Sequence, residues 1–228
     1  MLRYMLGLAA AMIAVEPVRA AEVQKGILSF RSGGVAFKMP LPKGYCLPSG
    51  TDIDAAQLMA AGDTENVTHA LLVRCDANSG EALGAKDYLI LQTPRQALLA
   101  PVTRGELLQA VGAEFEKPEF SAAIAGGEIE QEVEKSFGKV LGTEVKFDGA
   151  IRPLGRDDVC AFMGGVIEFK AVAVGYKISA ASCITSIGNR VMAINWYGPD
   201  THAAAIAELL KKARGVAESM TGEPVKLD

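Results

Sequence analysis

The stretch "VGYKISAASCITSIGNRVMAINWYG", residues 174–198, decides the fold. It holds two apolar runs, 174–187 and 190–198, and turn-forming residues bound each run, which is the signature of a strand. Gly188 and Asn189 stand between the runs in an order that is common in tight hairpins. The stretch is therefore predicted to form a hairpin of two antiparallel strands.

Two further strand patterns precede this hairpin, at residues 144–151 and 158–169. Consecutive strands with short links pair in the antiparallel sense, so the four strands together predict an antiparallel sheet. Gly164 and Gly165 indicate a bulge or a close backbone approach within the second of these strands.

The segment after the hairpin, residues 201–222, is predicted to form a C-terminal amphipathic helix. Asp200 or Thr201 is expected to cap this helix, and Gly222 followed by Pro224 is expected to end it. Apolar side chains at helical spacing make up its buried face: Ile206, Leu209, Leu210, Ala213, Ala217 and Met220.

The first half of the chain mixes strand and helix patterns. Thr103 and Glu106 form a capping box at the start of one predicted helix, which is expected to stop before Pro118. The complete order predicts the α+β class, with a mainly antiparallel sheet packed with helices in a single domain over residues 21–228. In this half, strands are predicted over 27–30, 34–42, 67–75 and 86–94, and helices over 54–62, 103–116 and 127–142.

The N-terminal segment, residues 1–20, is predicted to be a cleaved secretory signal peptide. Arg3 supplies a short basic region, an apolar run follows from 6 to 15, and cleavage is expected between Ala20 and Ala21. The apolar run is much shorter than the ~20 residues that span a bilayer, so an uncleaved anchor is not favoured. A Sec-type signal of this kind predicts a periplasmic or secreted bacterial protein.

The charge of the chain is mildly acidic. The 228 residues carry a formal net charge of −4, and without the signal segment, which holds Arg3, Arg19 and Glu16, this becomes −5. Because the sequence has no cluster of basic residues, we expect no nucleic-acid partner. No segment after residue 20 is long and apolar enough to span a membrane as a helix.

The cysteines fall into two pairs that lie far apart in the sequence. An even number of cysteines in an oxidising compartment favours two disulfides, although four cysteines allow three connectivities. We favour Cys46 with Cys75 and Cys160 with Cys183, because the latter two can lie on neighbouring strands. Each bond would contribute ~3–4 kcal/mol in the chain-entropy model. The alternatives are free or mixed thiols, or a zinc site of Cys46, His69 and Cys75, whose spacing matches no compact ligand motif.

No catalytic constellation is present in the sequence, and no catalytic, cofactor-binding or metal-binding residue is predicted. One alternative is a periplasmic hydrolase-type enzyme that uses His202 with Asp200. The simpler interpretation of His202 is an exposed polar residue in the first turn of the final helix. His69 lies in a strand pattern and is interpreted as a partly buried or edge residue. Of Trp196 and Tyr197, at least one is expected in the core.

Two stretches together resemble the Mog1/PsbP/DcrB-like fold group. The first is "GVAFKMPLPKGYCLP" (34–48), a strand that runs into a turn, and the second is "ITSIGNRVMAINWYGPD" (184–200) with the helix that follows it. The resemblance covers the order of strands and helices over about two-thirds of the mature chain. The helix-rich stretch 103–141 and the four cysteines are not features of the group. The resemblance implies an antiparallel sheet between helices and mostly non-catalytic, partner-binding or assembly roles, and it carries over no site residues.

These observations favour a disulfide-stapled protein of the bacterial envelope that binds an envelope protein or a small ligand without catalysis. The hydrolase-type enzyme and the thiol- or metal-dependent protein are the competing hypotheses. The first depends on His202 as a base, and the second depends on free thiolates at Cys46 and Cys75.

Overall fold

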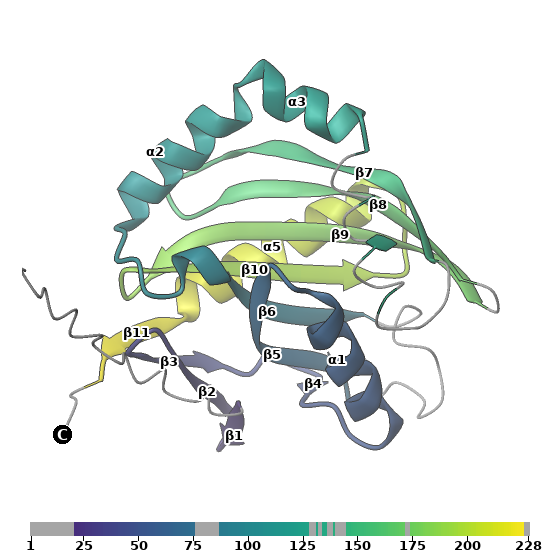
Figure 1. Ribbon diagram of the computed structural model, residues 1–228. Coiled ribbons are helices and arrows are strands. Elements are labelled where there is room, and N and C mark those ends of the chain that lie inside the picture. The colour runs from purple at the N-terminus through teal and green to yellow at the C-terminus, as the bar shows by residue number, and fades with distance from the viewer. Residues whose placement is uncertain are drawn as a thin grey trace, which may run out of the picture.

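The predicted hairpin of residues 174–198 is present in the computed structural model of the chain (Figure 1). Its strands are β9 (Val174–Ile187) and β10 (Arg190–Gly198), which pair in the antiparallel sense. In the turn, Gly188 has φ 57° and Asn189 has φ 58°. Glycine adopts this left-handed conformation freely and asparagine tolerates it, which explains how these two residues make the tight turn.

The structure describes residues 21–75, 87–127, 131, 134, 135, 139, 145–171 and 174–225. The predicted signal peptide, residues 1–20, lies outside the described residues. The same holds for most of the helix predicted over 127–142, of which Gly127 lies in a turn and residues 131, 134, 135 and 139 are helical.

A seven-stranded sheet forms the centre of the fold. Its order is β4–β5–β6–β10–β9–β8–β7, and every neighbouring pair is antiparallel, which confirms the predicted α+β class. The remaining strands of this sheet are β4 (Tyr45–Cys46), β5 (Asn66–Arg74), β6 (Tyr88–Pro94), β7 (Val145–Arg156) and β8 (Ala161–Ala171).

A smaller antiparallel sheet joins the two ends of the described chain. Its order is β1–β2–β3–β11, so the last strand pairs with β3 across almost the whole sequence. The four strands are β1 (Glu22–Gln24), β2 (Ile27–Ser32), β3 (Val35–Pro40) and β11 (Thr221–Pro224).

Helices cover both faces of the seven-stranded sheet (Figure 1). On one face, α5 (Ala203–Ser219) and the smaller sheet enclose the main core, into which β10 sends Met192, Ile194 and Trp196. The opposite face, here called the α1–α3 face, carries α1 (Thr51–Gly62), α2 (Arg104–Phe115) and α3 (Pro118–Ala125). Because strand side chains alternate between faces, Asn195 and Tyr197 lie on the α1–α3 face.

The predicted ends of the C-terminal helix are wrong at both termini. The helix begins at Ala203, and its N-cap is His202 rather than Asp200 or Thr201. It ends at Ser219, before the predicted stop at residues 222–224, because the next residues pair with β3 as strand β11. Pairing between distant segments has no signal in the local sequence.

The capping box of Thr103 and Glu106 is confirmed, because each side chain accepts from the backbone N–H of the other. Helix α2 ends at Phe115, before Pro118, as predicted, and Pro118 opens the separate helix α3, which the sequence did not predict. Proline is favoured at the first position of a helix, since its missing N–H would have no partner there.

Gly164 allows a close backbone approach, which is one of the two roles predicted for the Gly164–Gly165 pair. A Cβ atom at this position would lie 2.9 Å from Leu154 Cδ1 and 3.1 Å from both the Ala180 backbone oxygen and Ile206 Cγ2. The absence of a side chain therefore lets α5 pack against β8 through Ile206.

Candidate functional site

Both predicted disulfides are present in the structure. Cys46 is bonded to Cys75 across 29 residues, and Cys160 is bonded to Cys183 across 23 residues. The hypothesis of a thiol or zinc site at Cys46, His69 and Cys75 is therefore wrong, because both sulfurs are used in a disulfide. Two disulfides fit a protein that folds in an oxidising compartment outside the cytoplasm.

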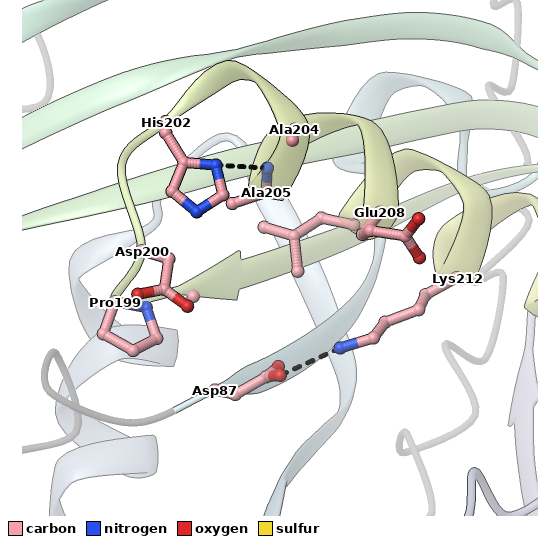
Figure 2. Close-up of a pocket in the computed structure, with 10 residues that line it drawn as sticks. Asp87, Pro199, Asp200, His202, Ala204, Ala205, Glu208 and Lys212 are labelled. Atoms are coloured by element: carbon pink, nitrogen blue, oxygen red, sulfur yellow. Dashed lines mark hydrogen bonds and ion pairs between the residues drawn. The ribbon is translucent and has the colours of Figure 1, made fainter.

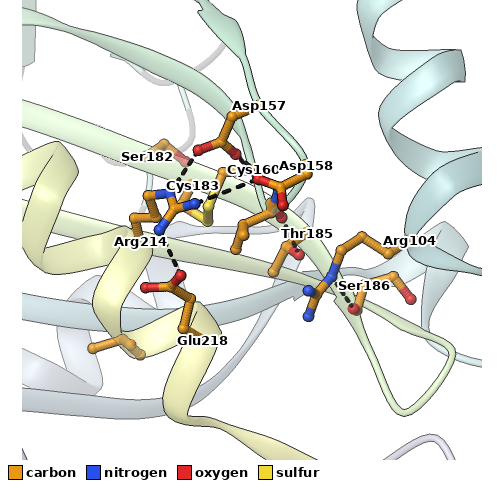
Figure 3. The surroundings of a disulfide bond; sticks show 12 residues. Arg104, Asp157, Asp158, Cys160, Ser182, Cys183, Thr185, Ser186, Arg214 and Glu218 are labelled. Carbon is orange, nitrogen blue, oxygen red and sulfur yellow. Dashed lines mark hydrogen bonds and ion pairs between the residues drawn. A yellow bond between two sulfur atoms is a disulfide. The ribbon is translucent and has the colours of Figure 1, made fainter.

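The Cys160–Cys183 disulfide is fully buried beside α5 (Figure 3). Just before Cys160, Asp157 accepts the backbone N–H groups of Val159 and Cys160, each at 2.8 Å. Its other carboxylate oxygen accepts from Arg214 of α5 at 2.5 Å. This arrangement identifies Cys183 as part of a structural staple.

His69 lies in the core and not at a sheet edge. It is 4% exposed, its Nε2 lies 2.9 Å from Thr93 Oγ1, and its ring stacks on Phe30. Since the Thr93 hydroxyl donates to the backbone oxygen of Val191, it accepts from Nε2–H of His69. Nδ1 is then an acceptor without a partner among the described residues, and burial lowers the pKa of His69 to about 4.

An open pocket of ≈ 260 Å³ lies at the start of α5, and we call it the α5 pocket (Figure 2). Three segments of the chain meet there: Asp87 before β6, the end of β10 with the residues that follow it, and the first turns of α5. The side chain of Leu209 is 5% exposed and forms part of an apolar floor, while charged groups stand at the rim. The pocket is lined by Asp87, Gly198, Pro199, Asp200, His202, Ala204, Ala205, Glu208, Leu209 and Lys212.

The geometry of His202 does not support the hydrolase-type hypothesis. Its Nδ1 accepts the backbone N–H of Ala205 at 3.1 Å and thereby caps α5 (Figure 2). In the catalytic arrangement, Nδ1–H would donate to the carboxylate and leave Nε2 free to take a proton. Here a neutral ring must carry its proton on Nε2, and no hydrogen bond joins His202 to Asp200 within the described chain.

The charges of the α5 pocket are only partly neutralised. Lys212 lies 3.0 Å from Asp87 and 5.2 Å from the centroid of the Trp196 ring. Its ammonium group is therefore paired with a carboxylate and also contacts an aromatic ring. Trp196 is 2% exposed and donates from Nε1 to Asp87, which confirms that it belongs to the core. Asp200 and Glu208 have no cationic partner among the residues that the structure describes.

A second polar site lies on the α1–α3 face of the sheet, and sequence reasoning missed it. Hydrogen bonds connect Ser182 of β9, Asn195 of β10, Gln92 of β6 and Asp63 at the end of α1, which we call the polar row. Gln92 is 7% exposed, and the other three are half-buried. The only sequence signal was a polar residue inside an apolar strand, as in "LILQTP" (89–94) and "VMAINWY" (191–197).

Two classes of feature are missing from the part of the chain that the structure describes. Within the described ranges, no helix is long and apolar enough to cross a membrane. In the same ranges, no group of three or more His, Cys, Asp or Glu side chains is placed to hold a metal ion.

Comparison with known proteins identifies similar structures at low sequence identity. The sequence matches no protein-family model and no curated protein. LpqN of Mycobacterium tuberculosis, which is involved in cell envelope biogenesis, is similar with 11% identity, coverage of 84% of this chain and 86% of that chain, and a TM-score of 0.30. Cyanobacterial PsbP (CyanoP) from Synechocystis sp. PCC 6803 has 10% identity, coverage of 96% and 99%, and a TM-score of 0.31. Both are members of the PsbP/Mog1-like fold group that the sequence resembles, and at these TM-scores neither carries an argument about function.

Proposed function

We propose that the chain is a non-catalytic binding module of the bacterial envelope, and that a small ligand or an envelope protein occupies the α5 pocket. On this proposal, residues 1–20 direct export to the periplasm or beyond, and cleavage between Ala20 and Ala21 releases the single domain 21–228. The two disulfides support export, because structural disulfides persist in oxidising compartments and are rare in the cytoplasm.

The observation that carries the proposal is the role of His202 in the α5 pocket. The pocket contains an imidazole, which is the group most often used for acid–base catalysis near neutral pH. That imidazole is committed to the backbone of Ala205, so it holds the helix and is not poised to accept a proton from a substrate. A pocket with charged walls and a capped helix supports binding without catalysis.

The charged and apolar residues of the α5 pocket favour one orientation of a bound ligand. Asp200 and Glu208 are carboxylates without a cationic partner among the described residues, while Leu209 offers apolar contact below them. A bound group that carries positive charge at the rim and apolar surface toward the floor would therefore be complementary to it.

The proposal is tested by filling the pocket from an exposed position of α5. Ala204 lines the pocket, so Ala204→Trp would occupy it, whereas Ala207 is also exposed on the same helix but is not among the lining residues. We expect native mass spectra of protein from the periplasm to show a bound species on wild type and Ala207→Trp, and to lack it on Ala204→Trp. An unchanged bound species on Ala204→Trp, or none on wild type, would overturn the proposal.

A further inference from the structure

The polar row has a single hydrogen-bond direction over its whole length. Ser182 Oγ lies 2.6 Å from Asn195 Oδ1, Asn195 Nδ2 lies 2.8 Å from Gln92 Oε1, and Gln92 Nε2 lies 2.8 Å from Asp63 Oδ2. Gln92 Nε2 also lies 3.1 Å from Thr68 Oγ1, so both of its amide hydrogens have acceptors. Each donor in the row thus points toward Asp63.

The carboxylate of Asp63 fixes this direction. A carboxylate can only accept, and Asp63 already accepts from the backbone N–H groups of Glu65 and Asn66 and from the Asn66 side chain. The nitrogen of Gln92 must therefore face Asp63, and its oxygen must face Asn195. The same reasoning turns the oxygen of Asn195 toward Ser182, so the Ser182 hydroxyl proton is committed to Asn195.

The far end of the row is left with unused hydrogen-bonding capacity. Ser182 Oγ has donated its only proton, so it can serve an incoming group only as an acceptor. Asn195 Nδ2 uses one hydrogen for Gln92, and its second hydrogen has no acceptor among the residues that the structure describes. The two side chains together present one acceptor and one donor side by side.

A small cavity opens at this end of the row. It measures ≈ 30 Å³, and its wall includes Ser182, Asn195, Tyr197, Ile151 and Met163. This volume exceeds the roughly 10–15 Å³ that one water molecule needs, so the cavity admits a hydroxyl group together with the carbon atoms next to it. Burial, aided by the charge of Asp63, raises the pKa of Tyr197 to about 12, so its phenol is neutral.

From this geometry we infer a second binding site, in which the cavity takes an alcohol hydroxyl of a neutral ligand. The ligand hydroxyl donates to Ser182 Oγ and accepts from Asn195 Nδ2–H, while its carbon atoms lie against Ile151 and Met163. The site is distinct from the α5 pocket, so either can fail without the other.

The hydrogen-bond direction makes the inference testable with two small probes of similar shape. 2-Propanol can donate to Ser182, whereas acetone cannot. We expect 2-propanol to shift the ¹H–¹⁵N signals of the Asn195 and Gln92 side-chain amides at least about threefold more than acetone at equal concentration, because only the alcohol satisfies both groups.

Variants on the same strand provide the controls. Ser182→Ala removes the acceptor and should abolish the difference between the probes. Ser186→Ala removes a hydroxyl from the same face of β9, where it bonds to the Val102 oxygen outside the cavity, and should keep the difference. Equal shifts with both probes in the wild type, or a preserved difference in Ser182→Ala, would overturn the inference and indicate a water site only.

Asp63→Asn tests the direction itself. An asparagine can donate to Gln92, which allows the row to reverse and leaves the Ser182 proton free for a ligand acceptor. In this variant the response to acetone should rise toward that to 2-propanol. If the preference for 2-propanol is unchanged in a folded Asp63→Asn protein, Asp63 does not fix the row and the inference is wrong.

Discussion

Arg214 of α5 lies 2.5 Å from Asp157, measured from Nε to Oδ2, and so joins the C-terminal helix to the turn before Cys160 (Figure 3). Arg214 also lies 2.5 Å from Glu218 on its own helix and 3.4 Å from Asp158. Burial opposes the charge of Asp157, but the hydrogen bonds from Arg214 and from two backbone N–H groups outweigh it and lower the pKa of Asp157. One guanidinium thus supports the helix, the turn and the buried disulfide.

Arg214→Gln should lower the free energy of unfolding at neutral pH, by more than the loss of an ordinary surface ion pair, because Asp157 also holds the turn before Cys160. The lowered pKa of Asp157 means that this contribution is present above the unfolded pKa and is lost as the pH falls through the folded one. The difference between wild type and variant should therefore shrink in acid. Urea titrations at neutral and acidic pH measure it.

Glu218→Gln is the matched control for that experiment. It removes the exposed pair within α5, where the Glu218 side chain is 51% exposed, and leaves Asp157 untouched. An exposed pair within one helix contributes little to stability, so the loss should be smaller than for Arg214→Gln. Equal losses for the two variants would show that Arg214 acts through its own helix and not through Asp157.

The two disulfides should differ in their reactivity toward reductant. Cys75 is exposed, whereas Cys160 and Cys183 are both 0% exposed. A thiolate must reach a sulfur atom to attack it, so Cys46–Cys75 is expected to open first in the native protein. Timed alkylation followed by peptide mass analysis measures the order. Reduction of Cys160–Cys183 before Cys46–Cys75 would contradict the buried position of the former.

His69 should make the protein less stable as the pH falls from 6.5 toward 4. The pKa of His69 is lowered by burial to about 4, whereas the unfolded chain takes up a proton near the ordinary value of 6.5. The unfolded state therefore binds more protons within this window, and the free energy of unfolding should fall by about 3 kcal/mol across it, then level off. Above pH 6.5 both states hold a neutral ring and His69 causes no change.

His69→Gln separates this effect from that of the carboxylates. The amide retains a donor for Thr93 but does not titrate, so the variant should lose much less stability between pH 6.5 and pH 4 than the wild type. Parallel pH curves for the two proteins would show that burial of His69 does not set the acid sensitivity.

His202→Ala and His202→Asn should behave differently if His202 serves as a helix cap. Alanine removes the acceptor for the Ala205 N–H and should cost about 1 kcal/mol, whereas asparagine is a favoured N-cap and should preserve stability. Thermal unfolding of both variants tests the cap. If His202→Asn keeps the bound species and the cellular phenotype of the wild type, the result agrees with a binding role. If His202→Asn is stable but loses the cellular phenotype, the imidazole itself is required and catalysis is favoured.

The parts of the fold that the sequence predicted are those with local signals. The Gly188–Asn189 turn, the Thr103–Glu106 capping box and the separation of the cysteine pairs each depend on residues close in the chain. Strand β11 was missed because its partner β3 lies at the other end of the described chain. Helix α3 was missed because Pro118 was interpreted as a stop, although the same residue is also a favoured start.

The polar row shows why the site was harder to predict than the fold. Asp63 and Ser182 are brought into one row by the register of four strands, which no single segment specifies. In contrast, His202 and Asp200 are near neighbours in the sequence and suggested a pair that the helix cap then excludes. Proximity in sequence was a poor guide to hydrogen bonding at the start of α5.

The most direct test of the account is the intact mass of protein isolated from the bacterial periplasm, denatured with excess alkylating agent and no reductant. The proposed function predicts a chain that begins at Ala21, since residues 1–20 would be removed on export, and that carries no alkyl group, since both disulfides are closed. A mass that includes residues 1–20, or the addition of two or more alkyl groups, would contradict an exported, stapled binding module and would return thiol chemistry to consideration.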